Sequence, residues 1–321
     1  MKLGVFLALF CDKTLPEALD IAKEFGVDAV EVGTGNYPGD PHCKPDELLA
    51  SESARKAFLK EFEKRNLAIS ALSCHGNPLH PDTATAKAHR EVQRKTILLA
   101  EKLGIPRIVT FSGCPGDSDS SRFPNWVTCP WPTDFSDLLK WQWEKKVIPY
   151  WKEEAAFAVQ HNVREICLEM HPGFVVYNPE TLLRLRSAAG EAIGANFDPS
   201  HLFWQGIDPV AAVTRLGKAV FHVHAKDTKI NPYTSSVNGV LDTKTYLDEP
   251  NRSWVFRTVG YGHGPEFWKD FVSVLRMAGY DGVLSIEHED SLMSTREGLG
   301  KAVTFLRHIL INEPKPQAWW T

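Results

Sequence analysis

The chain has 321 residues, of which 43% are hydrophobic and 24% charged, as is typical of a globular protein with a sizeable core. This composition excludes a disordered or collagen-like chain. With 36 Lys and Arg against 40 Asp and Glu, the formal net charge is −4. The chain therefore lacks the basic footprint that binds a phosphate backbone, and we expect no nucleic-acid partner.

Short apolar runs alternate with amphipathic stretches along the whole chain. The predicted strands are residues 2–9, 29–33, 68–75, 107–113, 165–171, 193–198, 220–227 and 282–289. The predicted helices are residues 15–25, 51–65, 83–103, 135–161, 179–189, 209–216, 265–278 and 292–310. Proline near the start and glycine just past the end of several helices support these boundaries.

Strict strand–helix alternation predicts a parallel sheet, and eight repeats predict a single (β/α)₈ TIM barrel spanning residues 1–321. A doubly wound sheet with an appended domain is the alternative. The surplus over a barrel of about 250 residues lies in three connections, 34–50, 114–134 and 228–264, which follow the second, fourth and seventh strands. Strand-to-helix loops emerge on the C-terminal face of a barrel, so we expect these three connections to cover an active site there.

The first ten residues imitate a short secretory signal, with Lys2 before an apolar run. No Ala-x-Ala cleavage site follows, and the run suits a buried strand equally well. The six cysteines are scattered without a Cys-x-x-Cys pair, so we expect reduced thiols and a cytoplasmic location. No apolar stretch approaches the ~20 residues of a membrane-spanning helix, and we expect no membrane partner.

Four consecutive predicted strands end in residue types that bind metals: Glu169, Asp198, His224 and Glu287. Side chains alternate along a strand, so one residue at each end can point into the barrel mouth. Crowded acids would repel one another or bind protons, whereas a divalent cation satisfies the carboxylates and the imidazole together. One nitrogen and three carboxylates suit Mn²⁺, our first choice, or Mg²⁺ or Co²⁺; Zn²⁺ is possible, although a closed structural zinc site favours thiolates.

Taken together, Glu169, Asp-Pro-Ser-His at 198–201, His-Val-His-Ala-Lys-Asp at 222–227 and Ser-Ile-Glu at 285–287 resemble the xylose isomerase-like barrels of the sugar phosphate isomerase/epimerase superfamily. The resemblance covers essentially the whole chain. That superfamily includes ketose 3-epimerases, inosose dehydratases and isomerases, and apurinic endonucleases. The resemblance implies that Glu169, Asp198, His224 and Glu287 hold the metal, and that His201 and His75 contact the substrate.

Two departures from the family pattern bear on the reaction. The endonuclease branch needs a histidine after the fourth strand, where this chain has Phe-Ser-Gly-Cys at 111–114, and the acidic balance also opposes DNA. The 3-epimerases use an arginine shortly after the strand-seven histidine, whereas here Arg252 and Arg257 follow a long insertion. The substrate of the 3-epimerases therefore does not carry over directly.

The resemblance favours a metal-dependent sugar isomerase or epimerase in which Glu169 and Glu287 are the catalytic acid–base pair beside a metal-stabilised enediolate. His201 and Lys226 would donate to substrate oxygens, with Asp227 supporting the site. The alternative is a dehydratase or lyase that eliminates a β-substituent from an inosose or 3-keto-glycoside, including C-glycosides. A non-catalytic sugar-binding subunit is a third hypothesis, which the complete ligand set disfavours.

Further contacts with a small sugar or keto-sugar are expected from Trp126 in the aromatic loop 122–131, and from Trp204, Arg257 and His263. Packing within the protein is the alternative for the aromatic residues. The absence of a Gly-rich phosphate loop favours a non-phosphorylated substrate. The tail 317–321 carries Trp319 and Trp320, which indicates docking on the body or a subunit contact, as in a homo-oligomer or with a hetero-subunit partner.

Overall fold

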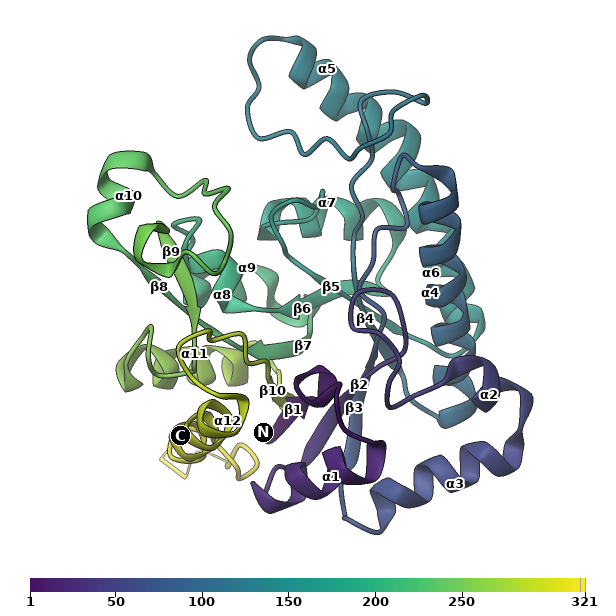
Figure 1. Cartoon of the computed structure of the whole chain (residues 1–321), viewed down its shortest axis with the longest axis vertical. Coiled ribbons are helices and arrows are strands. Elements are labelled where there is room, and N and C mark those ends of the chain that lie inside the picture. The colour runs from purple at the N-terminus through teal and green to yellow at the C-terminus, as the bar shows by residue number, and fades with distance from the viewer. Residues whose placement is uncertain (318, 321) are drawn as a thin grey trace.

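Eight parallel strands close into a barrel in the computed structural model, which describes residues 1–317 and 319–320 (Figure 1). The strands are β1 Lys2–Phe6, β2 Ala29–Gly33, β3 Ala68–Ser73, β4 Arg107–Phe111, β5 Glu165–Glu169, β6 Ile193–Phe197, β7 Val220–Ala225 and β10 Val283–Ile286. The first strand pairs with both β2 and β10, which closes the barrel. The predicted (β/α)₈ barrel is confirmed, and the doubly wound alternative, which needs open edges, is wrong.

Amphipathic helices cover the outside of the barrel (Figure 1). They are α1 Leu15–Glu24, α3 Glu52–Glu63, α4 Thr83–Leu103, α6 Ile148–Gln160, α7 Pro179–Ala189, α9 Pro209–Leu216, α11 Pro265–Met277 and α12 Thr295–Arg307. Side-chain caps fix their starts: Asn178 accepts from the Thr181 amide at 2.9 Å and Asp208 from the Val210 amide at 2.8 Å. Gly104 ends α4 with a φ of 69°, a conformation that suits glycine.

Most predicted elements end within a few residues of their observed bounds, and two of them also differ in kind. Residues 7–9 leave the first strand and belong to the short 3₁₀ helix η1 Leu7–Phe10. The predicted helix 135–161 is divided into α5 Asp134–Trp141, the π-helical η2 Gln142–Val147, and α6. Pro149 at the start of α6 has no N–H to donate, so the regular hydrogen-bond ladder cannot run through this junction.

The insertions differ from one another in structure. The first contains the helix α2 Pro45–Ala50, whereas no helix or strand lies between Phe111 and Asp134. The third is not a bare loop: it forms an antiparallel pair, β8 Asp227–Ile230 with β9 Trp254–Arg257, together with α10 Pro232–Asn238 and η4 Glu249–Asn251. Figure 1 shows α10 with β8 and β9 at the upper left, and α5 at the top, both away from the barrel strands.

The fully buried Asp227 side chain joins the two ends of the third insertion. Its Oδ2 accepts from the backbone amides of Gly260, Gly262 and His263 at 3.1, 3.1 and 2.9 Å. Its Oδ1 accepts from the Thr228 amide at 2.9 Å and lies 2.7 Å from His263 Nδ1. The predicted support of the metal ligands by Asp227 is therefore not what its contacts show, because the residues it binds belong to the insertion and its return to α11.

The C-terminal tail lies mostly at the surface. Residues 318 and 321 lie outside the described residues, so the predicted docking of the tail is assessed only on the rest. Trp319 is 89% and Trp320 71% exposed, which leaves a subunit contact as a prediction. Among residues 1–317 and 319–320, no helix combines the length and apolar character needed to cross a membrane.

We expect Asp227→Asn to lower the free energy of unfolding by about 2–4 kcal/mol, because an amide cannot accept all these hydrogen bonds and leaves buried donors unpaired. Chemical denaturation would measure the loss. Asp208→Asn is the matched control, since an exposed helix cap accepts Asn equally well and should change by less than about 0.5 kcal/mol. Equal effects of the two substitutions would contradict this role of Asp227.

Candidate metal centre

Four side chains converge at the carboxyl ends of the barrel strands. Glu169, Asp198, His224 and Glu287 each bring one ligand atom to within 4.8 Å of the others. They lie at the ends of β5 and β7 and directly after β6 and β10. The first three are buried, and the Glu287 side chain is 15% exposed. The structure thus brings together the four residues that the sequence analysis singled out.

Two atoms of this cluster are buried without a hydrogen-bond partner in the described part of the chain: Asp198 Oδ2 and His224 Nδ1. The imidazole Nδ1 lies 3.3 Å from Glu169 and 3.2 Å from Glu287, close enough for an ion pair but without hydrogen-bond geometry. Buried polar atoms are rarely left unpaired. Carboxylate oxygens and an imidazole nitrogen that converge in this way fit a divalent cation.

Hydrogen bonds fix the carboxylates in place. Asp198 caps the short helix α8 Pro199–Phe203, because its Oδ1 accepts from the Ser200 amide at 2.8 Å. Its Oδ2 makes no hydrogen bond within the described residues and lies 3.2 Å from both Lys226 Nζ and His201 Nε2. Glu169 Oε2 accepts from Asn196 Nδ2 at 2.9 Å and lies 3.1 Å from His75 Nε2. Both ligands are therefore oriented by the protein itself, as a preformed site requires.

The fully buried Glu31 on β2 is a functional candidate that the sequence analysis missed. It accepts from His224 Nε2 at 3.0 Å, from Ser285 Oγ at 2.8 Å and from Ser73 Oγ. Burial by itself raises the pKa of Glu31, but His224 and His222 outweigh it and lower that pKa to about 2. The carboxylate thus engages Nε2 of His224 and leaves Nδ1 for a metal, the usual arrangement of a supported histidine ligand.

Two cationic side chains balance part of the acidic charge. Lys226 Nζ lies 2.8 Å from Glu287, 3.0 Å from Glu289 and 3.2 Å from Asp198. Burial lowers the pKa of Lys226, but these carboxylates raise it well above its usual value. Burial likewise lowers the pKa of His201, and Asp198 outweighs it to raise that pKa to about 9. Both side chains are therefore charged at neutral pH.

The predicted substrate contacts divide into two groups. His75, His201 and Lys226 touch the ligand residues, as expected for groups at the barrel mouth. The other four make their contacts elsewhere: Trp126 packs edge-on against Tyr177 at 5.4 Å, Trp204 stacks on Trp254 at 4.7 Å, Arg257 pairs with Asp290 at 3.1 Å, and His263 stacks on Phe203 at 3.7 Å. Trp204 and His263 therefore pack against other aromatic rings, and the substrate contacts of these four residues stay predictions.

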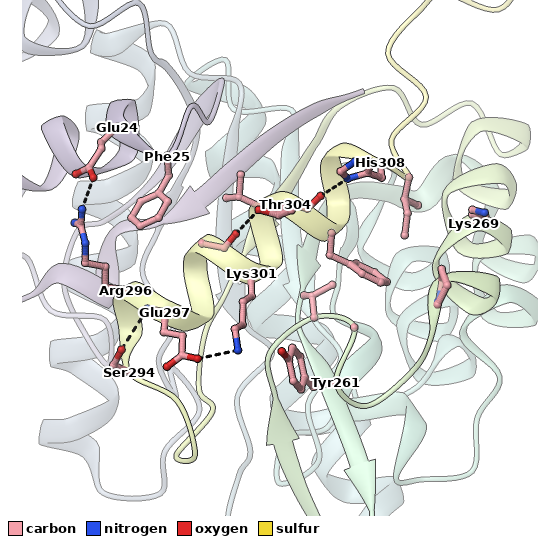
Figure 2. A pocket seen from close by; sticks show the side chains of 17 residues that line it. Glu24, Phe25, Tyr261, Lys269, Ser294, Arg296, Glu297, Lys301, Thr304 and His308 are labelled. Carbon is pink, nitrogen blue, oxygen red and sulfur yellow. Dashed lines mark hydrogen bonds and ion pairs between the residues drawn. The ribbon is translucent and has the colours of Figure 1, made fainter.

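A large cavity on the outside of the barrel does not coincide with this cluster. It measures about 1200 Å³ and runs along α12, where Figure 2 shows Phe25, Tyr261 and Thr304 among its lining side chains. The Glu297–Lys301 ion pair of 2.7 Å lies on the same helix. None of the four ligand residues lines this cavity, so its size does not mark it as the reaction site.

A closed (β/α)₈ barrel with a carboxylate–histidine cluster at the carboxyl ends of its strands places the protein in the sugar isomerase/epimerase-like class of TIM barrels. The family model described as xylose isomerase-like TIM barrel matches residues 19–309. The chain belongs to this family.

Known proteins resemble the chain in sequence or in fold. The uncharacterised protein YfiH of Bacillus subtilis (strain 168) is 43% identical over 296 residues, which is 92% of this chain and 94% of YfiH. The probable 3-DHS dehydratase AsbF of Bacillus anthracis has a TM-score of 0.66 at 18% identity, covering 96% of this chain and 99% of AsbF. A D-tagatose 3-epimerase-like protein has a TM-score of 0.64 at 20% identity, covering 96% of this chain and 98% of that protein. These two solved structures share the fold.

We expect Glu31→Gln to weaken the binding of Mn²⁺ by about 10- to 100-fold, because an amide orients and polarises His224 less well. Titration of the metal-free protein by calorimetry would measure the affinity. Glu165→Gln is the control: it removes a carboxylate from the other end of β5, where Glu165 pairs with Arg107 at 2.7 Å. Unchanged affinity in a folded Glu31→Gln protein would remove Glu31 from the metal centre.

Metal binding should release about one proton at pH 7, since the ligand form of histidine is neutral. Burial lowers the pKa of His224, but Glu31 and Glu287 raise it well above its usual value, so the metal-free protein carries His224 protonated. The observed affinity should therefore fall by up to about tenfold for each pH unit lost. Calorimetry of Mn²⁺ binding in buffers with different ionisation heats tests this, and an affinity that stays constant from pH 8 to 6 would contradict it.

Proposed function

We propose that the protein is a divalent-metal-dependent sugar isomerase or epimerase that removes a proton from the carbon beside a substrate carbonyl. One observation carries the proposal: Glu169 and Glu287 lie 3.3 and 3.2 Å from the same His224 Nδ1, which makes no hydrogen bond within the described residues, so two carboxylates from different strands flank one candidate metal position. Mn²⁺ remains our first choice among the metals that such oxygen and nitrogen donors suit.

The two glutamates are the proposed proton carriers. The pKa of Glu287 is raised by burial, but Lys226 and His224 outweigh this and lower it to about 2, so its carboxylate is ionised and able to accept a proton at neutral pH. One glutamate takes the proton from the substrate carbon, and either the other glutamate returns one to the opposite face or the first returns it elsewhere on the same face. The first course is epimerisation, and the second is aldose–ketose isomerisation. A bound divalent cation supplies Lewis-acid stabilisation of the negative charge that develops on the substrate oxygens.

Charged donors beside the glutamates would hold the substrate. Lys226 and His201 are both buried and cationic, and they lie 3.2 Å from Asp198 and 3.1 Å from Glu169 respectively. His75, 3.1 Å from Glu169, offers a further ring nitrogen. These three side chains are proposed to donate hydrogen bonds to the hydroxyl and carbonyl oxygens of a small sugar, in positions that prevent rotation of the reacting carbon.

β-Elimination from a keto-sugar is the second candidate function. It begins with the same proton abstraction, after which the electrons expel a group from the β carbon instead of recovering a proton. A cavity of about 460 Å³ that shares His171 and Glu289 with the surroundings of the cluster leaves room for a departing group. The likeness to the probable 3-DHS dehydratase AsbF supports this candidate at the level of the fold. A cytoplasmic location and an oligomeric state remain predictions of the sequence.

Incubation of the Mn²⁺-loaded protein with ketoses, inososes and 3-keto-glycosides in D₂O, followed by NMR, separates these reactions. Deuterium incorporation with an inverted stereocentre is the result expected for an epimerase, and deuterium with a shifted carbonyl is expected for an isomerase. Loss of water or of an aglycone would establish elimination instead.

Glu169→Gln and Glu287→Gln should each slow deuterium exchange by about 10²- to 10⁴-fold, the usual contribution of a positioned base. Glu266→Gln, an exposed residue in the first turn of α11, is the control and should exchange at the wild-type rate. The proposed function would be abandoned if wild type, with metal bound, exchanged no proton of any of these substrates.

A further inference from the structure

A second hollow lies directly beside the ligand cluster. It has a volume of about 460 Å³, and its lining includes His171, Tyr246, Leu247, Phe256, Glu289 and Ser291. These residues come from the loop after β5, from the third insertion and from the segment after β10. We call it the insertion cavity. Its volume falls in the range of about 300–1,000 Å³ that is usual for small-molecule sites.

The residues that line the insertion cavity contact Lys226 and His201, which in turn contact the four-residue cluster. The Phe256 ring centroid lies 4.5 Å from Lys226 Nζ and 5.5 Å from the His201 ring. Glu289 lies 3.0 Å from the same Lys226 Nζ, and the His171 ring lies 4.0 Å from that of His201. A molecule bound at the cluster and extended past Lys226 or His201 therefore enters the insertion cavity.

A stack of aromatic rings forms one side of the cavity. Trp204 lies on Trp254 at 4.7 Å with an interplanar angle of 6°, and Trp254 meets Phe256 at 5.2 Å. Phe256 in turn stacks on Tyr246 at 5.6 Å and 18°. The guanidinium of Arg252 lies 4.4 Å from the Tyr246 ring centroid. Trp204, Trp254 and Phe256 are buried and support Tyr246, which is 53% exposed and offers its ring to a ligand.

The charges around the cavity favour a neutral ligand. Glu289 contributes a carboxylate, and the nearest cation, Lys226, is already paired with Glu287, Glu289 and Asp198. A phosphate or carboxylate placed here would meet Glu289, while Arg252 is buried behind the Tyr246 ring and donates to the backbone oxygens of Trp254 and Lys244. Tyr246, Leu247 and Phe256 instead provide apolar and aromatic surface, on which a flat ring can stack.

We propose that the insertion cavity is a subsite for a neutral aromatic aglycone of a glycoside whose sugar ring carries a keto group and lies at the candidate metal cluster. The inference rests on the proposed function and deepens it, because it assigns the substrate to aryl keto-glycosides, which retain the carbonyl that proton abstraction requires; simple phenyl and methyl glycosides then serve as binding probes that cannot react. It also gives the third insertion a role: the insertion supplies Tyr246, Leu247 and Phe256, and Trp204 supports them from α8's C-terminal end.

Binding of paired glycosides tests the subsite without turnover. Phenyl and methyl β-glycosides of glucose, galactose and xylose would be titrated into the Mn²⁺-loaded protein by calorimetry. In at least one pair the phenyl glycoside should bind about 3- to 10-fold more tightly, the gain expected for one aromatic contact. Tyr246→Ala should remove this preference and leave the affinity for the methyl glycoside unchanged.

Two further variants make the outcome decisive. Tyr233→Ala is the matched control, because Tyr233 is another exposed tyrosine of the same insertion and does not line the cavity. Ser291→Trp fills the cavity from the opposite side and should abolish the phenyl preference even if Tyr246→Ala folds poorly. Equal affinities of phenyl and methyl glycosides in all three pairs, equal losses in Tyr233→Ala and Tyr246→Ala, or tighter binding of cellobiose than of phenyl glucoside would each overturn the proposal.

Deuterium exchange on ketoses, inososes and 3-keto-glycosides separates the failure of this inference from that of the proposed function. A phenyl preference without proton exchange on any substrate would support the subsite and contradict the isomerase or epimerase. Proton exchange at the wild-type rate without any phenyl preference would retain the reaction and overturn the subsite.

Discussion

Negative charge gathered at the carboxyl ends of the barrel strands is the constraint on which the site depends. Five carboxylates meet there beside three cationic groups. The carboxylates belong to Glu31, Glu169, Asp198, Glu287 and Glu289, and the cationic groups to His201, His224 and Lys226. Burying charges is costly unless they are paired. A divalent cation would offset part of the remaining negative charge, so the same excess of acid that costs stability in the metal-free protein would favour metal binding.

The barrel meets this constraint in two layers. In the lower layer, Glu31 binds Ser73, Ser285 and His224, which are side chains of three other strands. In the upper layer, His224 presents its second ring nitrogen to the cluster beside Glu169. Alternation of side chains along a strand makes this possible, since residues two apart face the same interior. The reactive layer is therefore built on a polar layer within the barrel.

The sequence predicted what depends on local order and missed what depends on closure of the barrel. Eight periodic runs and the residues at the end of each predicted strand located the four side chains of the cluster, because both are properties of short segments. Glu31 escaped notice because its partner His224 is 193 positions away in the chain. Trp204 and His263 were predicted to contact the substrate, which stays a prediction, and the sequence did not reveal that the third insertion folds as a small sheet that contacts both. Periodicity carries no signal for that fold.

The position of Asp227 bears on how such a barrel can diverge. The Asp227 carboxylate accepts hydrogen bonds from Thr228 at the start of the third insertion and from Gly260 and His263 at its end. The two ends of the segment are therefore held together where it leaves the barrel and where it returns. Doubling the length of a closed loop costs only about 0.6 kcal/mol. The segment between these anchors can therefore be lengthened or exchanged at little cost, and such a change leaves the barrel strands that carry the four-residue cluster unaltered.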